Sequence, residues 1–154
     1  MFLDVDGVLI TDKIRGEDRN NKWGVDIFDP QNVTILNEIL VETDADIILS
    51  SDWKYDHSLI ELQEMFIFNK VIKYPVSITP MFKTDAMKLE GNRAGEIQEW
   101  LDKPNRNYKI DKFVIIDDYD LREQFPNNFV YCRNTKEGLS AKGIKEQIIN
   151  ILNG

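Results

Sequence analysis

Two aspartates near the start of the chain have the type and spacing that metal-assisted or acid–base chemistry requires. Asp4 and Asp6 alternate with apolar residues in the stretch FLDVDGVL, residues 2–9. In an extended strand, residues two apart project from the same face, so the two carboxylates would lie together. Two like charges so close repel each other and must share a proton or a cation. Gly7 then permits a sharp turn because it has no Cβ. The pair therefore predicts a chemical site.

A calcium-binding loop of the EF-hand type is the alternative interpretation of the two aspartates and the glycine. Such a loop needs the pattern D-x-D-x-D-G and a Glu at its twelfth position. Here Val8, Leu9 and Ile10 follow the glycine. Three apolar residues do not suit a solvated calcium loop, so the sequence disfavours this interpretation.

A second pair of carboxylates ends the clearest buried strand of the sequence. The apolar run within residues 112–116 leads directly into Asp117 and Asp118. Adjacent carboxylates at the end of a buried strand have little structural benefit, whereas a hard cation such as Mg²⁺ prefers oxygen ligands. We therefore expect Asp117 and Asp118 to bind metal. Asp120 lies close by and is expected to be a turn residue.

Ser50 and Arg93 are candidates to contact a phosphoryl group. Ser50 ends a short apolar run at residues 45–49, and its hydroxyl could donate to a phosphoryl oxygen. Its structural alternative is to cap the next helix, and Ser51 competes for the functional role. Arg93 opens a predicted helix, where the helix dipole disfavours a cation. A role in orienting a carboxylate and offsetting phosphoryl charge would explain that placement.

The order of the predicted elements brings these polar residues to one edge of a sheet. Alternating strands and helices predict a three-layer α/β/α domain with a mainly parallel sheet that is covered on both faces. Such sheets bind ligands at the carboxyl ends of their strands. Strands are expected at the start of the chain and at 45–49, 112–116 and 129–132, helices from Pro30 and at 55–66, 93–103 and 140–152, and an edge strand or an irregular crossing at 71–80.

Composition fits one globular domain that spans residues 1–154 and is expected in the cytoplasm. Hydrophobic residues make up 42% of the chain and charged residues 30%, which is ordinary for a soluble protein. No apolar run approaches the roughly 18 residues that span a membrane, and no signal peptide is expected. The single cysteine, Cys132, excludes an intramolecular disulfide and fits a reducing compartment. The net charge of −8 disfavours a broad grip on nucleic acid but leaves room for a local basic groove.

Taken in order, the polar clusters resemble the four motifs of the haloacid dehalogenase (HAD) superfamily of phosphotransferases. The stretch Asp4–Leu9 is similar to the first motif, D-x-D-G-[VT]. Ser50 or Ser51 would serve as the second motif and Arg93 or Lys88 as the third. The fourth motif, a buried strand that ends in acidic residues, matches Asp117 and Asp118. The resemblance implies a Rossmann-like HAD fold and a phosphatase activity.

The resemblance also implies a mechanism. Asp4 would attack phosphorus and form an aspartyl-phosphate. Asp6 would protonate the leaving oxygen and then deprotonate the attacking water. Mg²⁺ would be held by Asp4, the backbone carbonyl of Asp6, and Asp117, with Asp118 beside them.

A finer resemblance is to the HAD domain of Swiss-army-knife RNA repair proteins. It rests on the stretches 49–54 and 93–101 and on Gly138-Leu139-Ser140. The gaps between the motifs are too short for a full cap domain, so residues 11–28 are expected to form at most a flap. An open site suits a bulky phosphorylated substrate, such as a polynucleotide end or a phosphoprotein. The alternative, a HAD-fold binding or regulatory module with little catalysis, is disfavoured by the intact Asp4, Asp6 and Asp117.

Three tryptophans allow two interpretations. Trp23 and Trp53 lie near the predicted site in sequence, where they could stack on a base or pack in the core. Trp100 has the spacing of a buried helix position.

Overall fold

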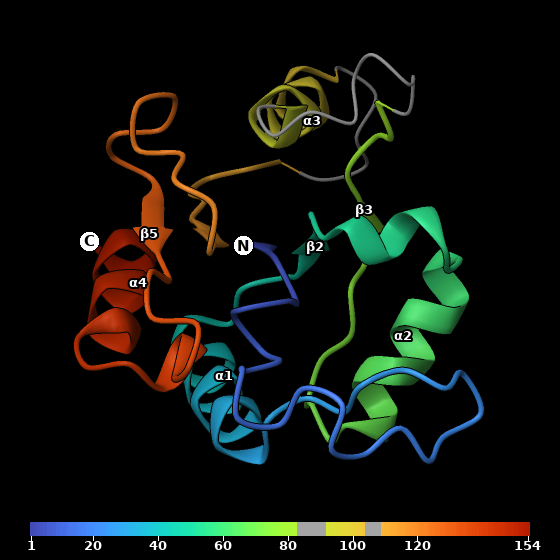
Figure 1. Cartoon of the computed structure of the whole chain (residues 1–154). Coiled ribbons are helices and arrows are strands. Elements are labelled where there is room, and N and C mark those ends of the chain that lie inside the picture. The colour runs from blue at the N-terminus through green and yellow to red at the C-terminus, as the bar shows by residue number, and fades with distance from the viewer. Residues whose placement is uncertain (83–91, 104–108) are drawn as a thin grey trace.

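All the strands of the computed structural model, which describes residues 1–82, 92–103 and 109–154, lie in one parallel sheet (Figure 1). The strand order is β3-β2-β1-β4-β5, with five strands among the described residues. The parallel α/β prediction is therefore confirmed. The bounds are β1 Phe2–Leu3, β2 Ile48–Leu49, β3 Ser77–Ile78, β4 Ile115–Asp117 and β5 Phe129–Tyr131.

The register of the central strand brings the predicted site residues level with one another. Leu3 of β1 pairs with Leu49 of β2 on one side and with Ile116 of β4 on the other. The next residue along each strand is therefore Asp4, Ser50 or Asp117. The ladder continues to this level, because the amide of Asp4 donates to the carbonyl of Ile116.

Helices cover both faces of the sheet, which confirms the three-layer arrangement. The helices are α1 Pro30–Thr43, α2 Leu59–Phe68, α3 Asn92–Asp102 and α4 Ile144–Asn153, with 3₁₀ turns η1 Asp52–Tyr55 and η3 Gly138–Ser140. In Figure 1, α1, α2 and α4 lie on one side of the sheet and α3 on the other. Within the described part of the chain, no helix is long and apolar enough to cross a membrane.

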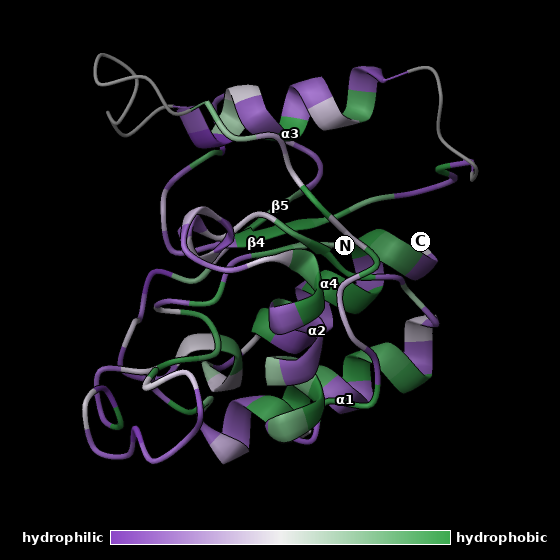
Figure 2. Cartoon of the chain, turned by 90° about the vertical axis from the view of Figure 1, so that its right-hand side faces the viewer, coloured by the Kyte–Doolittle hydropathy of each residue, from purple (hydrophilic) through white to green (hydrophobic). Residues whose placement is uncertain are grey.

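Alternation along the strands divides the core into two parts. Leu3 and Leu49 pack with α1, α2 and α4, whereas Phe2 and Ile48 pack with α3. Successive residues of a strand point to opposite faces, so both faces must be apolar. Figure 2 shows β4 and β5 coloured mostly as hydrophobic residues, while the helices carry hydrophilic and hydrophobic residues side by side.

The predicted start of α1 is confirmed. The carboxylate of Asp29 accepts from the amide of Gln31 at 3.0 Å, and Pro30 occupies the first turn. This cap satisfies one of the free amides of the first turn, and the fixed φ of proline suits that position.

Two predicted helices begin later than the pattern indicates. The expected helix at 55–66 is η1 followed by α2, because Ser51 caps the first and Ser58 caps the second. The helix expected from about Ser140 is η3 followed by α4, with Gly143 at φ +85° between them. The segment 71–80 contains the edge strand β3. Residues 11–28 form turns and irregular backbone.

Candidate active site

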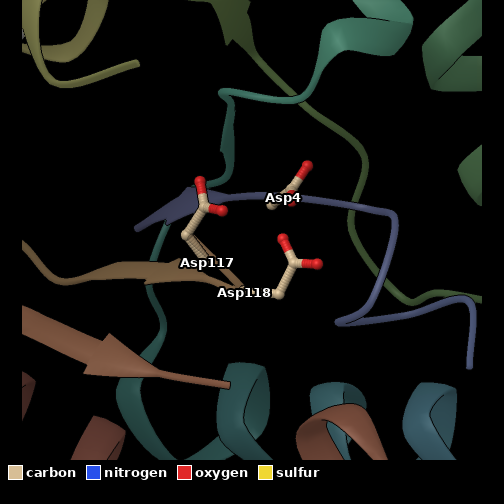
Figure 3. Close-up of side chains that lie close together, drawn as sticks. All are labelled: Asp4, Asp117 and Asp118. Atoms are coloured by element: carbon tan, nitrogen blue, oxygen red, sulfur yellow. The ribbon is translucent and has the colours of Figure 1, made fainter. Parts of the chain in front are cut away.

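Three aspartates meet where β1 and β4 end. One carboxylate oxygen each from Asp4, Asp117 and Asp118 lies within 4.8 Å of the other two. Figure 3 shows these side chains, which we call the carboxylate cluster, gathered between the ends of the two strands. Asp4 and Asp117 are buried, and Asp118 is partly exposed. The adjacent parallel strands β1 and β4 thus bring together residues more than 100 positions apart.

Gly7 lets the chain pass close to Asp118. Its φ is +76°, in the left-handed region that glycine adopts readily. A Cβ at this position would lie only 2.7 Å from Cγ of Asp118 and closer still to Oδ2. Both the backbone conformation and the space therefore require glycine here.

Burial and mutual repulsion make the carboxylate cluster hard to ionise. Burial, followed by the charge of Asp117, raises the pKa of Asp4 to about 8. Burial and then Asp4 raise the pKa of Asp118 to about 7. Burial also raises the pKa of Asp117. Three close carboxylates whose charged forms are disfavoured form a donor set that fits a hard divalent cation.

Arg93 reaches the carboxylate cluster from the first turn of α3. Its Nη1 donates to Asp117 Oδ2 at 2.5 Å and lies 3.5 Å from Asp4 Oδ1, while Nη2 donates to Asp52 at 3.1 Å. Burial alone would lower the pKa of Arg93, but the three carboxylates raise it overall. The structure thus brings Arg93 to the cluster. Lys88, the alternative cation, lies outside the described residues.

Ser50 and Ser51 differ in how their hydroxyls are used. Ser50 is fully buried at the end of β2, and its Oγ has no hydrogen-bond partner among the described residues. Ser51 Oγ accepts from the amide of Trp53 at 3.2 Å and caps η1. A buried hydroxyl without a partner is energetically unfavourable unless a ligand satisfies it. This contrast favours Ser50 as the residue that contacts a phosphoryl oxygen.

Asp6 stands apart from the carboxylate cluster. Strand β1 ends at Leu3, and the amides of Val8, Leu9 and Ile10 all donate to the carbonyl of Val5. That Asp4 and Asp6 project from one face of the chain stays a prediction. The carboxylate of Asp6 is not among the clustered ligand atoms. Metal binding through its backbone carbonyl stays a prediction.

The side chain of Asp6 is held by two donors from distant segments. Arg15 Nη1 donates to Oδ1 at 3.1 Å, and Trp53 Nε1 donates to Oδ2 at 3.0 Å. Arg15 belongs to the segment 11–28, so this exposed ion pair links that segment to Asp6. Asp120, by contrast, pairs with Arg122 in an exposed turn.

The sequence analysis missed a buried ion pair that fixes α3. Lys54 Nζ lies 3.0 Å from Glu96 Oε1 and donates to Thr79 Oγ1 at 2.7 Å, and both charged side chains are buried. Tyr55 donates to the other oxygen of Glu96 at 2.6 Å. Glu96 follows Arg93 by one turn of α3, so the pair locks the helix that carries the arginine. A signal was present, since Glu96 shares a face with the apolar Trp100.

The chain matches a model of a known domain family. The family is described as the HAD domain in Swiss Army Knife RNA repair proteins, and the match covers residues 1–144 of 154. It includes every residue of the site. No curated protein and no solved structure matches the chain significantly.

Proposed function

Because the chain belongs to the family of HAD domains in Swiss Army Knife RNA repair proteins, we propose that it is a Mg²⁺-dependent phosphomonoesterase. HAD domains belong to a superfamily of hydrolases and phosphatases, and we propose that this one forms an aspartyl-phosphate on Asp4. The observation that carries the proposal is the carboxylate cluster with Arg93 against it. A buried nucleophile beside an arginine and an unpartnered serine suits the transfer of a charged phosphoryl group.

The proposed roles divide the reaction into two displacements. In the first, an oxygen of Asp4 bonds to phosphorus, the bond from phosphorus to the leaving oxygen breaks, and Asp6 gives that oxygen a proton. In the second, a water attacks phosphorus, Asp6 takes its proton, and the bond from Asp4 to phosphorus breaks. Inorganic phosphate leaves, and both aspartates return to their starting state.

Ser50 and Arg93 would act on the phosphoryl oxygens. The Ser50 hydroxyl donates to one oxygen, which satisfies the partnerless Oγ. Arg93 offsets charge that spreads over the phosphoryl group in the transition state. Mg²⁺ held by Asp4, Asp117 and Asp118 would shield the negative charge that nucleophile and phosphoryl group share.

We further propose that the substrate is a phosphorylated polynucleotide end. The family name points to RNA repair, and the described elements between the site residues leave no cap domain to enclose a small substrate. Residues 1–154 would act as a single domain, with residues 11–28 as a flap held at the site by Arg15. The buried free thiol of Cys132 suits a reducing compartment such as the cytoplasm.

A substrate panel with purified protein and Mg²⁺ tests the activity and the substrate together. We expect release of phosphate from 3′- or 5′-phosphorylated oligonucleotides to exceed release from nucleotides, sugar phosphates and phosphopeptides in kcat/KM. Faster release from phosphopeptides would replace the nucleic-acid substrate by a phosphoprotein. No release from any of them would support a binding module instead.

Acid-quench trapping of labelled phosphate tests the two aspartates separately. Asp4→Asn removes the nucleophile and should trap no label with any substrate. Asp6→Asn removes the acid and base, so an aryl phosphate with a good leaving group should still load Asp4, and the aspartyl-phosphate should accumulate. Equal trapping on both variants, or full activity of Asp4→Asn, would remove Asp4 as the nucleophile.

A further inference from the structure

The indole of Trp53 is aimed at the carboxylate of Asp6 rather than into open space. Its Nε1 donates to Asp6 Oδ2 at 3.0 Å, across 47 positions of sequence. Trp53 belongs to η1, which follows the strand that ends in Ser50. The tryptophan is thus neither a plain core residue nor a free stacking platform.

Packing fixes the position of this donor. The Trp53 ring lies 6.2 Å from the ring of Phe28 and 6.1 Å from that of His57, and its own amide donates to the capping Ser51. Trp53 also packs against the main hydrophobic core. A side chain held by a cap and by rings on two sides can orient a neighbour with little loss of conformational entropy.

The two contacts of Asp6 differ in strength and permanence. Arg15 and Asp6 form their pair at the surface, with both side chains more than two-fifths exposed, and such pairs contribute only about 0–1 kcal/mol. The arginine can therefore leave Oδ1 without much cost. The indole is a neutral donor, so it can bond to Oδ2 whether the carboxyl group carries a proton or not.

We propose that Trp53 is a positioning residue for Asp6. This inference rests on the proposed function, in which Asp6 exchanges a proton with the leaving oxygen and then with water. By holding Oδ2, the indole leaves Oδ1 as the oxygen that gives and takes the proton, and it keeps the carboxyl plane in one orientation through both displacements. No new bond is made or broken by Trp53 itself.

The first test is the leaving-group dependence of Trp53→Phe. With an alkyl phosphate, which needs a proton on its leaving oxygen, we expect kcat to fall about tenfold while KM changes by less than about twofold. With an aryl phosphate that has a good leaving group, we expect a much smaller fall in the rate of the phosphorylation step. Replacing Trp53 by 3-benzothienylalanine, which keeps the ring shape and removes only the N–H, should give the same selectivity if Phe perturbs folding.

The control is Trp100→Phe, and the decisive comparison is the Asp6→Asn background. Trp100 Nε1 donates to Ser77 at 3.0 Å, so the control removes an equivalent bond away from Asp6 and should show no leaving-group selectivity. If Trp53 acts through Asp6, its substitution should have almost no effect once Asp6 is Asn.

An equal fall in the rate of the phosphorylation step with both substrates, or an undiminished effect in the Asp6→Asn background, would overturn the positioning role alone. A wild-type protein that releases no phosphate from either substrate would overturn the proposed function and this role with it.

Discussion

Replacing Gly7 by Ala should damage the proposed metal site more than the fold. The new Cβ would lie 2.7 Å from Asp118 Cγ. Reaching an ordinary contact distance of 3.4 Å would need Asp118 to move by about 0.7 Å. Metal–ligand distances tolerate deviations of only about 0.2 Å, so Asp118 would be lost as a ligand. The positive φ adds a cost of about 1 kcal/mol to folding.

The expected rise in melting temperature on Mg²⁺ binding follows from mass action. At a Mg²⁺ concentration 100 times the wild-type Kd, binding adds about 2.7 kcal/mol to the free energy of unfolding. For a chain of this length each kcal/mol is worth about 2–4 °C, so the wild-type melting temperature should rise by about 5–10 °C. If the substitution weakens affinity about 100-fold, the same concentration would add only about 0.4 kcal/mol.

Gly16→Ala is the matched control. Gly16 has φ +79°, and a Cβ there would meet no atom within 4 Å. The control therefore has the same backbone strain without the clash, and its stabilisation by Mg²⁺ should equal that of the wild type. The assay is a thermal melt of the three proteins across a Mg²⁺ titration, supported by calorimetric binding. A folded Gly7→Ala protein with the full wild-type response to Mg²⁺ would refute the placement of the metal on Asp118.

Three further predictions separate the roles of the surrounding residues. Ser50→Ala should leave the melting temperature within about 2 °C of the wild type, because Oγ has no partner in the part of the chain that the structure describes, yet it should lower kcat about tenfold. Ser51→Ala should instead cost about 1 kcal/mol in denaturant melts with little change in kcat. Burial raises the pKa values in the carboxylate cluster, so the folded state binds these protons more tightly. The metal-free protein should therefore lose stability as pH rises from about 4 towards 8, and melts at saturating Mg²⁺ should lack that slope. Lys54→Met should cost about 3–5 kcal/mol by leaving the charge of Glu96 buried without a counter-ion. Adding Glu96→Gln to this variant should restore part of the loss in urea melts. Equal stability of the single and the double variant would contradict this explanation.

The fold and the edge that carries the site were predictable because they depend on local patterns. Short apolar runs that end in Asp117 or Ser50 indicate strands, and parallel strands place their carboxyl ends at one edge. The Asp-Pro start of α1 is a local signal of the same kind. The order of the motifs also matched the family that the comparison found.

The features of the site that the sequence does not indicate depend on turns and on contacts between distant residues. The partners of the Asp6 carboxylate, Arg15 and Trp53, lie 9 and 47 positions away, and the strand pattern around Asp6 does not indicate them. The sequence favours Ser50 over Ser51 because Ser50 directly ends the apolar run, and the capping of η1 by Ser51 agrees with that preference. The Lys54–Glu96 pair joins residues 42 positions apart. The helical spacing of Glu96 and Trp100 indicates that Glu96 is buried, but a single sequence does not identify its partner.

The sheet is covered unevenly by helices, so the proposed active arrangement depends on a single helix that could open while the sheet stays folded. Three described helices pack on one face, but α3 alone among the described helices covers the other, and it carries Arg93. A local opening of α3 would withdraw the arginine while Asp4, Asp117 and Asp118 stay on the intact sheet. Opening one element costs less free energy than unfolding the whole protein. Because the buried Lys54–Glu96 pair holds α3 in place, the temperature at which the proposed activity is lost should depend on that pair as well as on the stability of the sheet.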